Sequence, residues 1–488
     1  LREWQETPNS PEDLAKIPML TRGDLTREIK PFVNRFMTAD TMRDGAKALE
    51  TQVIAHPLGT SGIDYLTFMF DISKLPQKFF PYLGIFKTLL GVLDTEHFSY
   101  AELDQEINIY TGGIGATVSV YTQNGDPSKY RMMAEVNCKV LHSNLEHAMR
   151  LIGEILSTTK WSSKDRILEV LEEERAAMRA DLPASGHATA AVRASSGFSE
   201  TALIMDCVNG VNAYHTLDEV CGLLEKGEAD EFLAKLEEMA RYIFRADHLM
   251  LDCTADENSL EEICAGTGTV AGSFPKGKTP EEDLKEYGAA FRVEPVKVKE
   301  GFTTSGQVQY VCRACNYGKK GCAYTGALRV LRVILGYDYL WQNVRVKGGA
   351  YGCMSSFSRD GSAYFVSYRD PHLAQTIRTF EEAPAYIRQF DADERTMTKY
   401  IIGAVSALDH PMSPSTYGKY SLAGYMTGFD EKKLQRERDQ LLDCGPEDIR
   451  ALAAHIEAFL SEDALCVVGN AEKLRAESDR FERMEKLQ

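Results

Sequence analysis

The sequence has 488 residues, of which 44% are hydrophobic and 26% are charged. Because this length exceeds that of a typical domain, we expect two or more domains, and the composition excludes a disordered or fibrous chain. Asp and Glu (72) outnumber Lys and Arg (55), giving a formal net charge of −17. This acidity disfavours nucleic acid and anionic membranes as partners. No apolar run is long enough for a membrane-spanning helix.

The cysteines and the first residues bear on the location of the protein. The 11 cysteines are odd in number and scattered, which predicts free thiols in a reducing compartment, either the cytoplasm or an organelle matrix. The chain opens on Leu-Arg-Glu-Trp-Gln-Glu, which is neither an initiator Met nor a secretory signal. We therefore expect it to begin within a longer gene product.

The first half of the chain predicts strands followed by helices. Residues 1–40 are rich in Pro and charge and are typical of a linker or a lead-in strand. Ser99 and Glu102 form a possible capping box for a helix ending at residues 111–113. The other expected elements are strands Thr51–His56 and Ile63–Ile72, helix Phe79–Leu93, strands Ala116–Thr122 and Tyr130–Val140, helices over 144–243, and strand Leu249–Cys253.

The second half repeats this order. Thr-Gly-Gly-Ile-Gly-Ala at 111–116 resembles Lys-Gly-Gly-Ala-Tyr-Gly at 347–352, so we expect a duplicated domain. The predicted boundaries are 1–22 (linker-like), 23–273 (first domain), 274–300 (linker) and 301–488 (second domain). The elements expected in the second half are strand Val308–Ala314, helix Tyr324–Val344, a hairpin turning at Asp360-Gly361, helices over 372–460, and strand Ala464–Gly469.

No histidine cluster has the spacing of a helical zinc site. None of the ten histidines lies in H-E-x-x-H or H-x-x-E-H. In the nearest case, His142 and Glu146 are four residues apart, but His147 points about 100° away from the position of a second ligand. We interpret this segment as a solvated helix start, with a metal site as the alternative.

The cysteine pair Cys312 and Cys315, with Cys322 nearby, resembles half of a zinc ribbon. A spacing of three on an alternating strand sends the two thiols to opposite faces. Buried thiols are therefore favoured over a zinc or redox site. G-x-S-x-G, P-loop and G-x-G-x-x-G motifs are absent, so no motif predicts catalysis by this chain alone.

The segment that carries the clearest chemistry runs from Leu340 to Gly352. Here a predicted helix ends at Arg345, Gly348-Gly349 allow unusual φ values and close backbone approach, and Tyr351 begins a strand. A guanidinium and a phenol beside a thin backbone suit a peptide carbonyl, or the oxyanion that it becomes when attacked. Alternatively, Arg345 pairs with a surface carboxylate and Tyr351 packs against the core.

This segment and three others together resemble a known family. Arg345–Gly352, followed by Ser-Tyr-Arg-Asp-Pro at 367–371, resembles the fourth domain of presequence-protease-type members of the pitrilysin/insulinase metallopeptidases. The third domain of that family is similar to three further segments: Pro-Asn-Ser-Pro-Glu-Asp-Leu-Ala from residue 8, Tyr-Thr-Gly-Gly-Ile-Gly from residue 110, and Ser-Gly-His-Ala-Thr-Ala-Ala-Val-Arg-Ala-Ser-Ser at 185–196.

The resemblance implies an α+β fold of two tandem homologous domains, each a mostly antiparallel sheet covered by helices. Such enzymes are two halves that enclose a chamber and degrade short unstructured peptides. Zinc is held by the N-terminal half. The predicted helices 79–93 and 324–344 contain no His, so this chain resembles the C-terminal half, with 1–22 as the remnant of the linker between halves. It is expected to bind no cofactor.

The resemblance also assigns site residues and partners. It implies that Arg345 and Tyr351, with Gly348 and Gly349, anchor the peptide and help to stabilise the transition state. The expected partners are the N-terminal catalytic half, on the same polypeptide or as a separate subunit, and a peptide substrate. A non-catalytic scaffold of the same fold is the alternative function.

Overall fold

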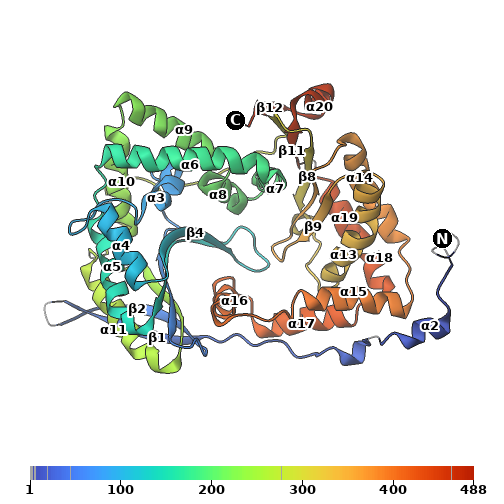
Figure 1. Ribbon diagram of the computed structural model, residues 1–488, viewed down its shortest axis with the longest axis horizontal. Coiled ribbons are helices and arrows are strands. Elements are labelled where there is room, and N and C mark those ends of the chain that lie inside the picture. Colours follow the sequence, from blue (N-terminus) through green and yellow to red (C-terminus); the bar gives the residue numbers. More distant parts are fainter. Residues whose placement is uncertain are drawn as a thin grey trace.

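The computed structural model describes residues 4, 7–18, 20–43, 46–275, 277–462 and 464–487. It contains two six-stranded sheets, each with helices packed on it (Figure 1). The predicted α+β fold of two tandem domains is therefore confirmed. Of the expected linker-like segment 1–22, residues 1–3, 5, 6 and 19 lie outside the described residues.

The first sheet has the strand order β1-β2-β6-β3-β5-β4. All neighbours are antiparallel except β2 and β6, which run parallel. The strands are β1 (Arg35–Arg43), β2 (Ala46–Pro57), β3 (Ile63–Asp71), β4 (Ile114–Thr122), β5 (Tyr130–Leu141) and β6 (Leu249–Ala255).

The helices of the first half follow the predicted order. The capping box at the start of α4 is present, since Ser99 Oγ accepts from the Glu102 backbone and the Glu102 carboxylate accepts from the Ser99 backbone. The helices are α2 (Pro11–Lys16), α3 (Leu83–Leu89), α4 (Tyr100–Tyr110), α5 (Leu145–Thr158), α6 (Lys164–Ala184), α7 (Gly186–Ser196), α8 (Glu200–Asn209), α9 (Val211–Lys226), α10 (Asp230–Ile243), α11 (Leu260–Ser273) and α12 (Pro280–Tyr287).

Two expectations for the first half need adjustment. The helix predicted over Phe79–Leu93 is a 3-10 turn followed by the short α3, because Leu90 is extended and Gly91 adopts a φ of 85°. The linker expected at 274–300 contains α12, and Tyr287 and Phe291 are buried in the first core. Apolar side chains therefore tie the front part of this segment to the first domain.

The second sheet has the order β12-β7-β11-β8-β10-β9. Its strands are β7 (Glu300–Thr304), β8 (Gln309–Asn316), β9 (Gly352–Phe357), β10 (Ser362–Tyr368), β11 (Ala464–Asn470) and β12 (Arg483–Lys486). Its helices are α13 (Ala327–Ile334), two π-helical turns (Leu335–Tyr339 and Trp341–Val346), α14 (Ala374–Arg388), α15 (Glu394–Ser406), α16 (Pro414–Met426), α17 (Glu431–Leu442), α18 (Pro446–Ala451), α19 (Ala453–Leu460) and α20 (Ala471–Ala476).

The two sheets share one topology. Five strands of each occur in corresponding order, β2-β6-β3-β5-β4 and β7-β11-β8-β10-β9. The outermost strand differs: in the first sheet β1 precedes β2, whereas in the second sheet β12 comes from the far end of the chain and lies parallel to β7. The repeated motif thus reflects two copies of one sheet, closed at one edge by different segments.

The two domains exchange helices. α7 packs against β8, β10 and β11 of the second sheet, and α16 packs against β2 and β6 of the first (Figure 1). Both contacts need a glycine, because a Cβ on Gly186 would lie 2.3 Å from the Tyr310 ring and one on Gly418 would lie 1.8 Å from Thr254 Oγ1. Each domain therefore covers a sheet face of the other.

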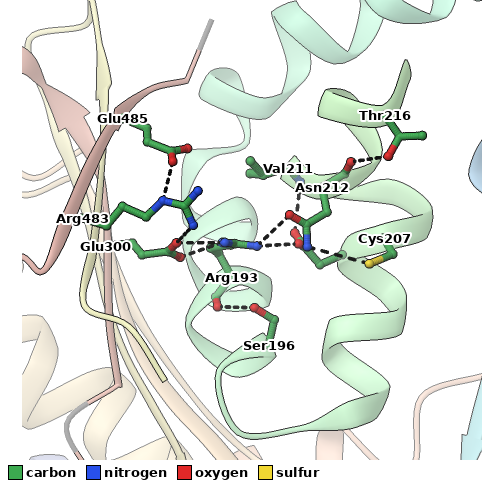
Figure 2. A network of polar contacts seen from close by, with 10 residues as sticks. Arg193, Ser196, Cys207, Val211, Asn212, Thr216, Glu300, Arg483 and Glu485 are labelled. Carbon is green, nitrogen blue, oxygen red and sulfur yellow. Dashed lines mark hydrogen bonds and ion pairs between the residues drawn. The ribbon is translucent and has the colours of Figure 1, made fainter. Parts of the chain in front are cut away.

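A buried ionic network joins the same two domains (Figure 2). Arg193 of α7 donates from Nε and Nη2 to Glu300 of β7 at 2.6 and 2.8 Å. Its Nη1 donates to Asp206 of α8 at 2.8 Å. Because all three side chains lie at the joint, the first domain is fastened to the second by charge as well as by apolar contact.

The lead-in segment, residues 21–34, lies along α16 and α17 before it enters the first sheet as β1 (Figure 1). Arg438 Nε donates to the Thr26 carbonyl at 2.8 Å, and the Val33 backbone donates to Ser421 Oγ at 3.0 Å. The segment therefore makes a second connection between the domains, beside the chain link near residue 300.

Candidate functional site

The Gly-Gly turn predicted from the sequence lies where the second π-helical turn meets β9. Gly349 adopts a φ of 78°, and its backbone N donates to the Arg345 carbonyl at 2.8 Å. A Cβ on Gly348 would lie 2.5 Å from the Val344 carbonyl oxygen. The chain can therefore turn directly from the helix into β9, the outermost strand of its sheet.

This turn brings Arg345 and Tyr351 together. Arg345 Nη1 donates to the Tyr351 carbonyl at 2.5 Å, and the guanidinium lies 5.3 Å from the Tyr351 ring centre. It also lies 4.1 Å from the centre of the Trp341 ring. The guanidinium thus stands between two rings, which limits its conformational freedom.

The pair is open to solvent. Tyr351 is 64% exposed, and within the described part of the chain its hydroxyl has no hydrogen-bond partner while Arg345 has no carboxylate partner. The alternative of a surface ion pair and a core tyrosine is therefore wrong. Both side chains have donor groups left for a ligand, whereas their role remains a prediction.

A chain of aromatic contacts supports Tyr351 from behind. Its ring packs edge-on against Tyr368 of β10, with centroids 5.7 Å apart. Tyr368 in turn packs edge-on against His187 of α7 at 4.9 Å. Burial lowers the pKa of His187, and its Nδ1 is buried without a partner in the described structure. The first domain therefore contributes a neutral ring to the support of the second domain's site.

Sequence reasoning missed these supporting residues for two reasons. Trp341 precedes Arg345 by four residues, a helical spacing that could have signalled a stacked pair. No local pattern connects His187 with Tyr368, because they belong to different domains and meet only through the packing of α7 on the second sheet.

The corresponding turn of the first domain lacks the donor pair. Gly113 has a φ of 112° and precedes β4, as Gly349 precedes β9. With the repeated motifs aligned, Ile109 and Gly115 occupy the places of Arg345 and Tyr351. The backbone of the repeat is thus present in both domains, and the chemistry only in the second.

The segment around His142 differs from the expected solvated helix start. His142 lies in a 3-10 turn and its Nδ1 is 2.8 Å from the buried carboxylate of Asp64. His147 stacks on Tyr110, with ring centres 4.1 Å apart. The expectation is wrong for His142 because Asp64 lies on β3, far away in the sequence. Among the described residues, no group of three or more His, Cys, Asp or Glu is placed to hold a metal ion.

The cysteine pair of β8 behaves as its spacing predicts. Cys312 is buried beneath α7, and Cys315 faces the main core of the second domain. Burial raises the pKa of Cys315 to about 12 and also raises that of Cys312. Thiols protonated at neutral pH on opposite faces of a strand do not form one ligand or redox pair. In the described part of the chain no helix is long and apolar enough to cross a membrane.

Comparison with known proteins defines the class first. Residues 1–220 match the family of domains associated with M16 peptidases of subfamily C, and residues 299–472 match "PreP C-terminal domain". A solved "peptidase M16 inactive domain" from Pseudomonas fluorescens superposes with a TM-score of 0.57 at 14% identity, covering 90% of this chain and 98% of that one. The periplasmic protease PqqL of Escherichia coli has a TM-score of 0.56 at 12% identity, covering 91% and 48%. The fold is that of paired M16 peptidase domains.

Curated relatives narrow the class. Protein HypA of Clostridium perfringens is 34% identical over 481 residues, which is 99% of this chain and 48% of that protein. Presequence protease 1 of Arabidopsis thaliana is 27% identical over 483 residues, 98% and 43% respectively. The chain thus spans about half the length of the curated relatives it matches. It is the counterpart of the C-terminal half of a presequence-protease-type M16 peptidase, as its motifs predicted.

Proposed function

We propose that this chain closes a peptide-degrading chamber with a zinc-bearing N-terminal half and anchors the peptide through Arg345 and Tyr351. The observation that carries the proposal is the exposed pair itself, held at the start of an edge strand with its outward donors unused by the described residues. A peptide running past β9 would meet a guanidinium and a phenol oriented before it arrives.

The two side chains have distinct roles in this proposal. The Arg345 guanidinium, stacked on Trp341, donates to a peptide carbonyl. The Tyr351 phenol donates to the carbonyl oxygen under attack and stabilises the charge that develops on it. Zinc, held by the other half, supplies the activated water. The chain alone is then inactive.

The proposal is tested by peptide degradation with this chain, with a candidate N-terminal half carrying an inverted zinc motif, and with their mixture, each with and without a chelator. We expect chelator-sensitive activity only in the mixture. Activity of this chain alone would refute the assignment. Binding of the halves to each other without activity would favour a scaffold.

Variants of the mixture test the two residues. Tyr351→Phe should lower kcat by about a hundredfold, the scale of one lost oxyanion donor, with unchanged thermal unfolding. Arg345→Lys should not restore wild-type turnover, because the planar fork is lost. Tyr337→Phe is the matched control: Tyr337 is 71% exposed on the preceding π-helical turn. Full turnover by Tyr351→Phe would exclude the proposed role.

A further inference from the structure

Beneath the lead-in segment lies a cavity of about 260 Å³. Ile29 and Lys30 of the segment form one wall, and α13, α16, α17 and the loop after α15 form the others. Its volume is several times the roughly 30 Å³ that one water molecule occupies. A monatomic ion or a single water would leave most of this space unfilled.

The cavity carries an excess of positive charge in an acidic protein. Four cationic side chains line it (Lys30, Arg329, Arg359 and Arg438), against two carboxylates. The whole chain has a net charge of −17. A local excess of two cations is therefore contrary to the charge of the molecule and favours an anion.

Both carboxylates are already engaged by arginines. Glu437 accepts from Arg359 Nε at 2.9 Å and Nη2 at 2.8 Å. Asp409 accepts from Arg438 Nη1 and Nη2, each at 2.8 Å. The arginines Arg359 and Arg438 are thus neutralised by the protein itself and act as structural groups.

The remaining two cations have no such partner. Lys30 Nζ donates to the His410 carbonyl at 3.0 Å. Arg329 lies beside the Tyr324 phenol, whose pKa burial raises and Arg329 opposes. Within the described chain neither forms an ion pair with a carboxylate. A half-buried guanidinium with free donors binds a carboxylate through two parallel hydrogen bonds.

Apolar side chains complete the lining, among them Ile29, Leu408, Met412 and Leu434. We propose that this cavity binds a small organic carboxylate with an apolar body, the carboxylate on Arg329 and Lys30 and the body against these side chains. Because Lys30 and Ile29 belong to the lead-in segment, the ligand would fasten that segment to the second domain. The inference is independent of the peptidase proposal.

The test is calorimetric titration and thermal unfolding of this chain with sodium benzoate. Benzyl alcohol, inorganic phosphate and sodium chloride at matched ionic strength are the comparisons. We expect saturable benzoate binding that raises Tm, and no saturable shift with the other three. No saturable binding of benzoate would overturn the proposal. Equal binding of phosphate would overturn the apolar part of it.

Two substitutions locate the site. Arg329→Met should weaken benzoate binding about tenfold or more, because a charge-assisted pair of hydrogen bonds is lost. Arg332→Met, on the exposed face of the same helix, should leave the affinity unchanged. If Arg329→Met fails to fold, Lys30→Met serves instead, since it lies outside both cores. Wild-type affinity in the folded Arg329 or Lys30 variant would place benzoate elsewhere and refute the site.

Discussion

Replacing Arg193 with methionine would remove the only cation that contacts both carboxylates in the described network of Figure 2. The side chains of Arg193, Glu300 and Asp206 are 12%, 5% and 1% exposed. Methionine keeps most of the apolar stem of Arg193, so the substitution acts chiefly on charge. Two carboxylates would remain at the joint between the domains without the guanidinium that binds them.

Removing one partner of a buried ion pair costs about 3–5 kcal/mol. We expect the lower end, about 3 kcal/mol, because both carboxylates keep some compensation. Arg483 Nη1 stays 3.6 Å from Glu300, and the Val211 backbone still donates to Asp206 at 3.0 Å. These contacts are weaker than the lost pairs, so they reduce the cost without cancelling it.

The penalty should depend on pH. Burial raises the pKa of Asp206 above its ordinary value, and Arg193 opposes that rise. Without Arg193 the pKa of Asp206 rises further. A carboxyl whose pKa is higher in the folded than in the unfolded state gains stability on protonation, and loses it as pH rises through the folded pKa. The difference between wild type and Arg193→Met should therefore shrink from about pH 7 to about pH 5.

The assay is urea unfolding followed by circular dichroism and tryptophan fluorescence, whose coincidence tests for two-state behaviour. Arg175→Met is the control, because Arg175 pairs with the exposed Asp218 and Glu225. That change should cost no more than about 1 kcal/mol. A loss below about 1 kcal/mol in Arg193→Met, or one that grows on acidification, would refute the reasoning.

Three further predictions concern other parts of the molecule. Trp341→Ala in the reconstituted peptidase should lower kcat/KM about threefold while Trp341→Phe retains it, since Arg345 loses its ring; equal kinetics would show that the stacking is idle. Cys312 and Cys315 should resist alkylation at neutral pH until the chain unfolds, because burial raises both pKa values; fast labelling of the folded chain would contradict this. Gly418→Ala should destabilise by about 1–3 kcal/mol through its clash with Thr254, whereas Gly153→Ala, with nothing within 4 Å of its Cβ, should be neutral or stabilising in denaturant titrations.

Features encoded in neighbouring residues could be predicted from the sequence. Alternation located the central strands β3, β5, β8 and β11, and the Ser99 capping box located the start of α4. The Gly-Gly turn and the Arg345–Tyr351 pair were also found, because all these groups lie within one short segment. In each case the deciding interactions are local, so the period or spacing of the residues carries the information.

Other features depended on packing between distant segments. β1, β7 and β12 were not assigned as strands: β7 follows a Pro- and Lys-rich stretch, β12 has four residues, and each is defined by its neighbour in the sheet. The burial of His142 against Asp64 and the support of Tyr351 by His187 join residues far apart in the chain.

The sequence by itself determined the duplication, the order of most elements and the chemistry of the exposed turn. Only the tertiary structure decided which helix covers which sheet and which charges are buried together. The exchange of α7 and α16 shows why. Their glycines look unremarkable locally, and the need for them arises only when a helix approaches the sheet of the other domain too closely for a Cβ.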